Sequence, residues 1–555
     1  MENREDLKSI IPFLPLILRS SSLFWQPPIL EALKALSKGP EHSNVDSGRL
    51  LALAISDLTN SFSFSPHALQ GYSLFFDDLM PKDQATRWFK EVLPKMADLL
   101  LKLPSLLESH YQTSAETRIR MLEPQQPGLV LLSQELIAAL LACSFFCLFP
   151  DINRGAKNLP TINFDDLFAC LNESYEEQQE SKIKCIVHYF ERISSCMPTG
   201  NVSFERKVLP LQQKDYCISY PRADFWSNSN LSLCPFEVDN CRLIEDHQCS
   251  EALEVDFANQ FLGGGALRRG CVQEEIRFMI NPELIVGMLF LPAMATNEAI
   301  EIVGSERFSS YTGYASSFRF SGDYVDQKDV DYLGRRKTRV IAVDALCSPG
   351  KKQYQSDFLL REINKAFSGF FYQHKCQQYQ ELFQDDRFGE FKADKNVKGL
   401  RERFMNDAVP LDPSSSSQRA GGDLGNQPIR SPNYEGSQSV ETEDRIGIVT
   451  GNWGCGAFGG DPEVKAIIQW LAASQALRPF IMYHTFGMKT VQSLDQVTQW
   501  IISQDWTVGE LWNMLVEYGL QRFKGRTEAG FFSWLLPSMR RPTMAPWGCC
   551  TPHLS

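Results

Sequence analysis

The second part of the chain alternates short apolar runs with amphipathic stretches. Apolar runs of strand length occupy residues 253–257, 299–303, 339–345, 446–450 and 479–486. Apolar residues recur at helical spacing within residues 273–279, 356–374, 462–476, 493–503 and 506–523. This alternation predicts an α/β domain with a mixed, largely covered sheet over residues 201–535. In such folds ligands bind beyond the carboxyl ends of the strands.

Residues 1–200 have helical spacing and few strand-like runs. The sequence predicts helices at residues 83–103, 131–149, 164–177 and 181–194. We therefore expect an all-helical accessory domain, which the turn-forming residues 197–200 separate from the α/β domain. Within the α/β domain, residues 407–444 are rich in Ser, Pro and Gly and predict a disordered surface insertion. Residues 536–555 predict an irregular tail.

The stretch at residues 253–278 combines a strand, a glycine loop and a helix. Leu253 and Val255 alternate with Glu254 and Asp256, which predicts a half-buried strand ending near Asn259. Positive φ angles and close backbone approach are then open to three consecutive glycines: Gly263, Gly264 and Gly265.

A helix is predicted to begin at Gln273, with Glu274 and Glu275 side by side in its first turn. Adjacent carboxylates raise each other's pKa unless another group compensates, which suggests a functional pair. Acidic residues also suit the first turn of any helix, where the macrodipole favours them. Spacing alone favours this structural interpretation.

A second glycine-rich stretch covers residues 446–462. Asp461 suits a helix N-cap and Pro462 the first helical position. The amides from Gly454 to Gly460 can form a nest that, with the helix N-terminus behind it, holds a diphosphate without Lys or Arg. A structural turn that packs Trp453 and Phe458 into the core explains the pattern equally well. The residues alone leave both interpretations open.

The triplet followed by Gln-Glu-Glu at 273–275, with Val-Asp-Phe-Ala-Asn at 255–259 before it, resembles the signature of the poly(ADP-ribose) glycohydrolases. Residues 451–461 resemble the diphosphate-binding loop of the same family, and the resemblance extends from about residue 205 to about residue 525. It implies a macrodomain-like catalytic domain. The chain resembles the short, plant-like form, without the long regulatory N-terminus of the animal members.

The resemblance implies hydrolysis of ribose–ribose bonds in ADP-ribose polymers carried on modified proteins, without a cofactor. Glu275 would act as general acid and then as general base. Glu274 would increase the proton affinity of its neighbour and, with Asn259, bind ribose hydroxyls; Asp256 would be a carboxylate near the catalytic loop. Substrate-binding residues would also include the glycine triplet and Gln273.

The remaining implied contacts surround the adenine and the diphosphate. Tyr314 and Phe486 would pack around the adenine, although each alone is more often a core residue. Ile244 and Glu245 would read the adenine edge. The diphosphate contacts would come from Asn452, Gly454, Cys455, Gly456, Ala457 and Phe458.

Charge and composition limit the alternatives. The 55 Lys and Arg against 67 Asp and Glu give a net charge of −12, which argues against direct nucleic-acid binding by bulk attraction. The 15 cysteines show no zinc spacing, so we expect no metal and reduced thiols. The start lacks signal-peptide character, and the longest uncharged apolar run, 136–149, falls short of the roughly 20 residues that a membrane span needs.

We therefore expect an intracellular, soluble and monomeric protein of the nucleus, the cytoplasm or both. Two other functions remain open from the sequence. The chain could be a catalytically silent ADP-ribose reader, which an intact Gln-Glu-Glu at 273–275 disfavours. It could also be an interaction scaffold that uses its helical region.

Overall fold

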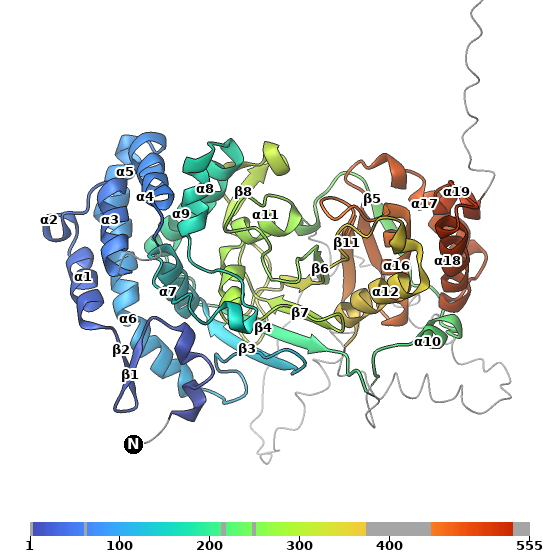
Figure 1. The fold of residues 1–555 in the computed structure, drawn as a ribbon, viewed down its shortest axis with the longest axis horizontal. Coiled ribbons are helices and arrows are strands. Elements are labelled where there is room, and N and C mark those ends of the chain that lie inside the picture. The colour runs from blue at the N-terminus through green and yellow to red at the C-terminus, as the bar shows by residue number, and fades with distance from the viewer. Residues whose placement is uncertain (1–3, 60–63, 213–217, 247–250, 373–445, 537–555) are drawn as a thin grey trace, which may run out of the picture.

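The computed structural model describes residues 4–59, 64–212, 218–246, 251–372 and 446–536. An eight-stranded sheet lies at its centre (Figure 1), in the order β3 (Gly128–Ser133), β4 (Asn201–Val208), β7 (Glu298–Val303), β10 (Arg339–Ala342), β6 (Ala252–Asp256), β11 (Gly447–Gly451), β12 (Ile481–His484) and β5 (Phe236–Asp239). The five strands from β10 to β5 run parallel, whereas β3, β4 and β7 pair antiparallel. The predicted mixed sheet is confirmed.

Helices cover both faces of this sheet. On one face, the core includes Leu253 and Ile448 of the sheet together with residues of α12 (Ser356–Phe370), α16 (Pro462–Gln475), α17 (Leu494–Ser503) and α18 (Val508–Phe523). On the other face, Phe204 and Ile302 pack with α11 (Gln273–Ile280), with the 3-10 helix η7 (Pro282–Leu289) and with the N-terminal helices. The sheet is therefore buried between two helical layers.

The N-terminal region is mainly helical and lies to one side of the sheet (Figure 1). Its longer helices are α1 (Pro27–Ser37), α3 (Gly48–Leu58), α4 (Pro66–Ser73), α6 (Leu93–Tyr111), α7 (Gln134–Phe145), α8 (Asp165–Glu173) and α9 (Glu177–Ser195). Their buried side chains belong to the same core cluster as Phe204 and Ile302. The helical region and the sheet thus share one continuous hydrophobic core.

The N-terminal region also contributes strands that the sequence did not predict. β1 (Ile17–Arg19) and β2 (Ser22–Phe24) form a hairpin, and β3 is an edge strand of the main sheet. The predicted start of a helix at residue 131 is wrong because residues 131–133 pair with β4. The side chain of Ser133 accepts a hydrogen bond from the amide of Leu136 (3.3 Å), and this cap begins α7 one residue later.

The half-buried interpretation of residues 253–257 is also wrong. β6 lies between β10 and β11 and is buried throughout, including Glu254 and Asp256. Arg277 of α11 compensates one of these charges, since its Nη2 lies 2.6 Å from Oε2 of Glu254. A central strand covered on both faces can carry alternating carboxylates only with such partners.

The other predicted helices and strands are present, with ends that differ by a few residues. The helix predicted at 83–103 is extended by α6 to Tyr111. The predicted insertion at 407–444, the end of the 356–374 helix and the tail beyond residue 536 lie outside the described residues. Among the described helices, none combines the length and apolar character needed to cross a membrane.

Candidate active site

The loop that connects β6 to α11 is the candidate catalytic loop, and its backbone holds Glu274. The amide of Asn259 donates to Oε2 of Glu274 (2.8 Å), and the amide of Gly263 donates to Oε1 (2.7 Å). The side chain of Gln273 is held in a similar way, accepting from the amide of Phe257 (2.8 Å) and donating to the carbonyl of Val255 (3.2 Å). The loop and the first turn of α11 are thereby joined into one unit.

Glu275 is held by two further amides. Its Oε1 accepts from Gly265 (2.9 Å), and its Oε2 accepts from Val272 (2.9 Å) just before the helix. The second bond is a helix-capping contact, so the structural interpretation of an acidic first turn is also correct. The predicted start of the helix at Gln273 is confirmed.

Glycine is required in this loop by close contact with the carboxylates. Gly264 has φ +50°, and a Cβ there would lie 2.6 Å from Oε2 of Glu274 and 2.7 Å from Oε1 of Glu275. A Cβ on Gly270 would lie 2.6 Å from the same oxygen of Glu275. These glycines therefore let the backbone wrap around the two glutamates.

Burial changes the protonation of the carboxyl groups behind the loop. Burial raises the pKa of Asp256 to about 8, with Arg277 opposing the rise and Glu275 adding to it. Burial also raises the pKa of Glu274 well above its usual range, helped by the charges of Asp256 and Glu275 and opposed by the amides that bond it. No described residue donates a hydrogen bond to the carboxylate oxygens of Asp256. These two carboxyl groups therefore favour the protonated form.

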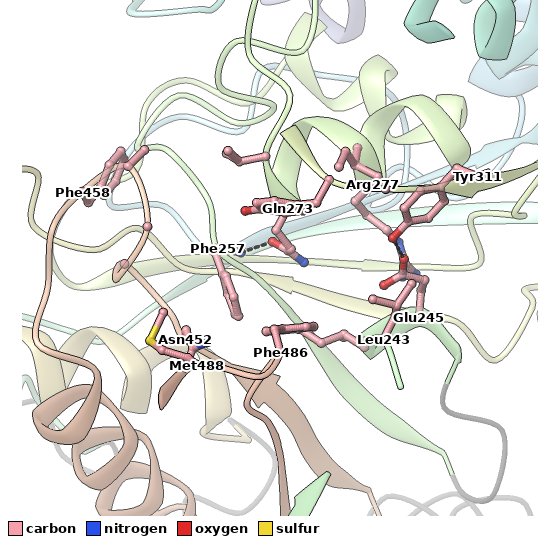
Figure 2. A pocket seen from close by; sticks show the side chains of 18 residues that line it. Leu243, Glu245, Phe257, Gln273, Arg277, Tyr311, Asn452, Phe458, Phe486 and Met488 are labelled. Atoms are coloured by element: carbon pink, nitrogen blue, oxygen red, sulfur yellow. Dashed lines mark hydrogen bonds between the residues drawn. The ribbon is translucent and has the colours of Figure 1, made fainter. Parts of the chain in front are cut away.

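A cavity of about 420 Å³ lies beyond the carboxyl ends of the parallel strands (Figure 2). Its walls come from the segments that follow β5, β6, β11 and β12 and from the start of α11. Ten of the residues proposed from the sequence line it: Ile244, Glu245, Gln273, Tyr314, Asn452, Gly454, Gly456, Ala457, Phe458 and Phe486. A cavity therefore lies at the edge of the sheet where the sequence analysis expected a ligand crevice.

The other candidates do not line this cavity. They are Asp256, Asn259, Gly263, Gly264, Gly265, Glu274, Glu275 and Cys455. Val272 and Gln273, which adjoin the two glutamates in the chain, do line it. The thiol of Cys455 donates to the carbonyl of Trp453 (3.4 Å), so its side chain is used within the loop.

Several lining residues were missed by sequence reasoning: Leu243, Phe257, Val272, Ile276, Arg277, Tyr311, Gly313 and Met488. Spacing could have indicated two of them, because Ile276 and Arg277 lie three and four positions after Gln273 on one face of α11. Tyr311 belongs to the hairpin strand β8 (Ser309–Thr312), and its hydroxyl donates to Glu245 (Figure 2). Local sequence gives no sign of that contact.

The two candidate aromatic residues are on the surface of the cavity. Tyr314 is 53% exposed and Phe486 is 43% exposed, so the core interpretation is wrong for both. Phe486 also has φ +50°, a left-handed conformation uncommon for an aromatic residue. Exposed rings at a cavity edge can stack on a planar ligand.

The glycine-rich loop after β11 presents free backbone donors. The amide of Gly460 donates to the carbonyl of Gly454 (2.9 Å), and Gly454 has φ +71°. The amides of Gly456, Ala457 and Phe458 donate to no residue in the described part of the chain, and all three residues line the cavity. Three successive free amides, named the nest here, are the array of backbone donors that anion binding by this loop requires.

The helix behind this loop does not add to the nest. Asp461 caps α16, because its Oδ1 accepts from the amides of Glu463 (3.0 Å) and Val464 (3.4 Å). The predicted N-cap and the position of Pro462 are confirmed. The prediction that the helix N-terminus assists the diphosphate is wrong, since a carboxylate already occupies these donors.

Comparison with known proteins gives a consistent result. The family profile described as "Poly (ADP-ribose) glycohydrolase (PARG), Macro domain fold" matches residues 223–493, and the one described as "Poly (ADP-ribose) glycohydrolase (PARG), helical domain" matches residues 80–206. The chain is 56% identical over 553 residues to poly(ADP-ribose) glycohydrolase 1 of Arabidopsis thaliana, covering 97% of this chain and 98% of that protein. The chain belongs to the poly(ADP-ribose) glycohydrolase family.

Sequence identity to other members of this family varies. Probable poly(ADP-ribose) glycohydrolase 2 of Arabidopsis thaliana is 50% identical over 550 residues, with 97% of this chain and 100% of that protein covered. Poly(ADP-ribose) glycohydrolase 1 of Caenorhabditis elegans is 31% identical over 353 residues, which cover 61% of this chain and 35% of that protein. The resemblance to the short, plant-like form and the macrodomain-like fold are confirmed.

In this member of the family, buried residues pack against the loop that carries the nest. The indole of Trp453 is buried and donates to the carbonyl of Val343 (2.9 Å), as the structural interpretation of the loop predicted. The ammonium of Lys465 lies 3.9 Å from the Trp453 ring centre and pairs with Glu362. Burial lowers the pKa of Lys465 well below its usual range.

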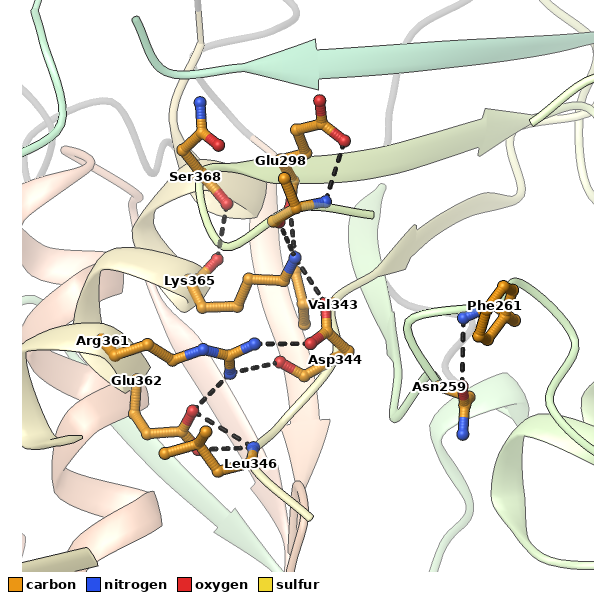
Figure 3. Close-up of polar contacts among 12 residues, drawn as sticks. Asn259, Phe261, Glu298, Val343, Asp344, Leu346, Arg361, Glu362, Lys365 and Ser368 are labelled. Atoms are coloured by element: carbon orange, nitrogen blue, oxygen red, sulfur yellow. Dashed lines mark hydrogen bonds and ion pairs between the residues drawn. The ribbon is translucent and has the colours of Figure 1, made fainter. Parts of the chain in front are cut away.

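Figure 3 shows how this network holds the segment after β10. Arg361 and Lys365 of α12 each lie 2.5 Å from a carboxylate oxygen of Asp344, and Glu362 accepts from the amide of Leu346 (3.3 Å). The amide of Ser348, two residues later, donates to the carbonyl of Phe458 (2.9 Å). The nest is therefore anchored to α12 through this segment.

The described residues contain no group of three or more His, Cys, Asp or Glu side chains that could hold a metal ion.

Proposed function

We propose that the protein hydrolyses the ribose–ribose O-glycosidic bonds of poly(ADP-ribose) and releases ADP-ribose, mainly from the chain end. Family membership supports the reaction. The observation that carries the proposal is Glu275, held by the amides of Gly265 and Val272 beside a cavity with three free amides at residues 456–458. A turnover assay on labelled polymer tests it.

Glu275 supplies both proton transfers of the reaction. The leaving ribose hydroxyl must be protonated while the other ribose becomes oxocarbenium-like, so Glu275 first donates a proton. It then removes a proton from the attacking water. Glu274 and Asp256 favour the protonated form, so they do not act as a second carboxylate. The bound diphosphate helps to stabilise the cation.

The cavity residues and the loop between β6 and α11 together bind one ADP-ribose unit. Phe486 and Tyr314 stack on the adenine, and Glu245, with Ile244, reads its edge. Asn259 and Glu274 bind ribose hydroxyls, while Asn452 and the loop residues 454–458 bind the diphosphate. The free amides and the edge-exposed rings support these assignments.

No cofactor takes part in this scheme. The glycine triplet positions the substrate through its backbone, and its amides bind Glu274 and Glu275. Gln273 contributes by binding the backbone of the loop between β6 and α11. Soaking or titration with ADP-ribose, followed by structure determination, tests each contact.

A silent reader and an interaction scaffold are the alternative functions. Both predict ADP-ribose or protein binding without release of ADP-ribose from polymer. Complete retention of labelled polymer after long incubation with the purified chain would favour them over the enzyme.

The partners are ADP-ribose polymers on modified proteins, and no direct nucleic-acid contact is part of the function. The protein acts as a monomer in the nucleus, the cytoplasm or both. The ten described cysteines are free thiols, which supports an intracellular site. Light scattering of the purified protein and imaging of a tagged chain test these statements.

The chain divides its tasks between a helical domain at residues 1–200, which supports the site, and a catalytic domain at residues 201–535, which carries it. The continuous core across residue 200 implies that the second domain needs the first. Expression of residues 201–555 alone tests this dependence.

A further inference from the structure

Lys182 on helix α9 of the N-terminal region is a buried lysine that contacts the catalytic loop. Lys182 is fully buried, and its Nζ donates to the carbonyl oxygens of Arg268 (2.5 Å) and Gly270 (2.7 Å). No carboxylate in the described part of the chain forms an ion pair with it. Burying an ammonium group costs several kcal/mol unless its hydrogen bonds compensate, so its position next to this loop needs an explanation.

The carbonyls that Lys182 binds belong to the turn that surrounds Glu275. The amides of Arg268 (2.9 Å) and Gly270 (3.1 Å) both donate to the carbonyl of Gly265, which closes residues 265–270 into one turn. The amide of Gly265 in turn donates to Glu275. The backbone of Gly270 packs so closely on the Glu275 carboxyl that a Cβ would overlap it. Lys182 therefore holds the outer side of the turn that cradles Glu275.

The charges of Lys182 and Glu275 also interact. Burial lowers the pKa of Lys182 to about 8, and the nearby charges of Cys271 and Glu275 oppose this fall. In a buried environment such an attraction is screened little by salt. The ammonium of Lys182 and the carboxylate of Glu275 therefore attract each other.

The other ion pairs between the helical region and this turn are on the surface. Arg268 lies 2.8 Å from Asp166, and Arg269 lies 3.1 Å from Glu173, with partly exposed side chains in both pairs. Exposed ion pairs contribute little. Ala266 and Leu267 of the turn pack in the core that the helical region shares. Lys182 is therefore the polar contact most able to fix the turn.

We propose that Lys182 is a positioning residue, through which the helical domain holds the 265–270 turn and, with it, the carboxyl group of Glu275. The inference rests on the proposed role of Glu275. It gives the N-terminal region a direct part in the geometry of catalysis, in addition to its share of the core.

Lys182→Met keeps the length of the side chain and removes its donors. It should lower kcat by about 10- to 100-fold, because misplacing a catalytic group by 1 Å can cost about 10²-fold. The dissociation constant of ADP-ribose should stay within about threefold, since Lys182 does not line the cavity. This separation of kcat from binding distinguishes positioning from a general loss of structure.

Lys207→Met is the control. Lys207 on β4 is also buried and donates to a backbone carbonyl, that of Gly369 (2.7 Å), and it pairs in addition with Glu301 (3.3 Å). It neither lines the cavity nor contacts the catalytic loop. The control should lose thermal stability and keep kcat within about threefold at a temperature well below its Tm. A kcat loss equal to that of Lys182→Met would contradict the inference.

If Lys182→Met does not fold, Lys182→Gln is measured instead, because its side-chain amide can still donate a hydrogen bond. The same criteria for kcat and for the dissociation constant of ADP-ribose then apply. A kcat within threefold of the parent, or equal losses in kcat and in ADP-ribose affinity, would overturn the inference. So would failure of both variants to fold, since Lys182 would then be a stability residue. Failure of the proposed function itself is seen separately, as retained turnover in Glu275→Gln.

Discussion

Oε1 of Glu275 accepts a hydrogen bond from the amide of Gly265 at 2.9 Å. The preceding residue, Gly264, has no room for a side chain. A side chain at Gly264 would overlap Glu274 and Glu275 together, in a backbone conformation with φ +50°. The two carboxylates and the glycine loop therefore form one geometric unit, and the following predictions test its parts.

Gly264→Ala should abolish most turnover, by at least about 10²-fold, because the added Cβ must displace a glutamate or the loop. Steady-state kinetics with polymer measures the loss. Gly155→Ala is the control, since Gly155 is exposed and a Cβ there meets nothing within 4 Å. Parent-like kinetics in Gly264→Ala would show that the glutamates have freedom that the structure does not show.

Gly456→Val should weaken ADP-ribose binding by about tenfold or more while the protein stays folded. Gly456 does not have a positive φ, and a Cβ there meets nothing within 4 Å, so a side chain fits the backbone. The added side chain would enter the cavity beside the free amides. Calorimetry with ADP-ribose and a thermal melt measure both effects.

Binding by backbone amides also predicts a weak salt dependence of ADP-ribose affinity in the parent. Unchanged affinity in a folded Gly456→Val variant would place the phosphate site elsewhere and leave the loop a structural role.

Phe486→Ala should weaken binding of adenosine and of ADP-ribose by similar factors, about 5- to 15-fold, because ring stacking contributes roughly 1–1.5 kcal/mol. Tm should change little, as the ring is exposed. Tyr332→Ala, at a residue that is 85% exposed and away from the cavity, is the control. Equal loss of binding in both variants would contradict an adenine contact at Phe486.

Asp256 predicts a pH dependence of stability. Its folded pKa of about 8 lies above the usual unfolded value, so its contribution is full below about pH 4 and is lost as pH rises through 8. Asp256→Asn does not titrate, so its free energy of unfolding relative to the parent should increase from pH 5 to pH 8, by at most about 4 kcal/mol. Denaturant unfolding at both pH values measures it; parallel profiles would show that Asp256 is not titrating in this range.

The sequence predicted the sheet and its flanking helices because hydrophobic periodicity is a local signal. The ten proposed residues that line the cavity were implied by the resemblance to the glycohydrolase family. Periodicity misassigned residues 131–133, since a short apolar run fits a strand or a buried helix equally well. It also missed the burial of Glu254 on the central strand β6, because this burial depends on Arg277, a partner more than 20 positions away in the chain.

Contacts between distant segments account for the remaining differences. Tyr311 reaches Glu245 across 66 positions, and Lys182 reaches Gly270 across 88. The sequence predicted that Asp461 caps α16. It did not show that this cap occupies the first amides of the helix, because that depends on which amides remain free in the folded loop. Such long-range and competitive contacts are set by tertiary packing.

Glu275→Gln tests the central claim most directly, because it keeps the shape of the side chain and removes its ability to transfer a proton. Turnover of labelled poly(ADP-ribose) should fall by about 10²- to 10⁴-fold, the range typical of general acid–base groups. The dissociation constant of ADP-ribose, measured by calorimetry on the same preparation, should remain close to that of the parent. Turnover within about tenfold of the parent would contradict the assignment of Glu275 as the proton donor.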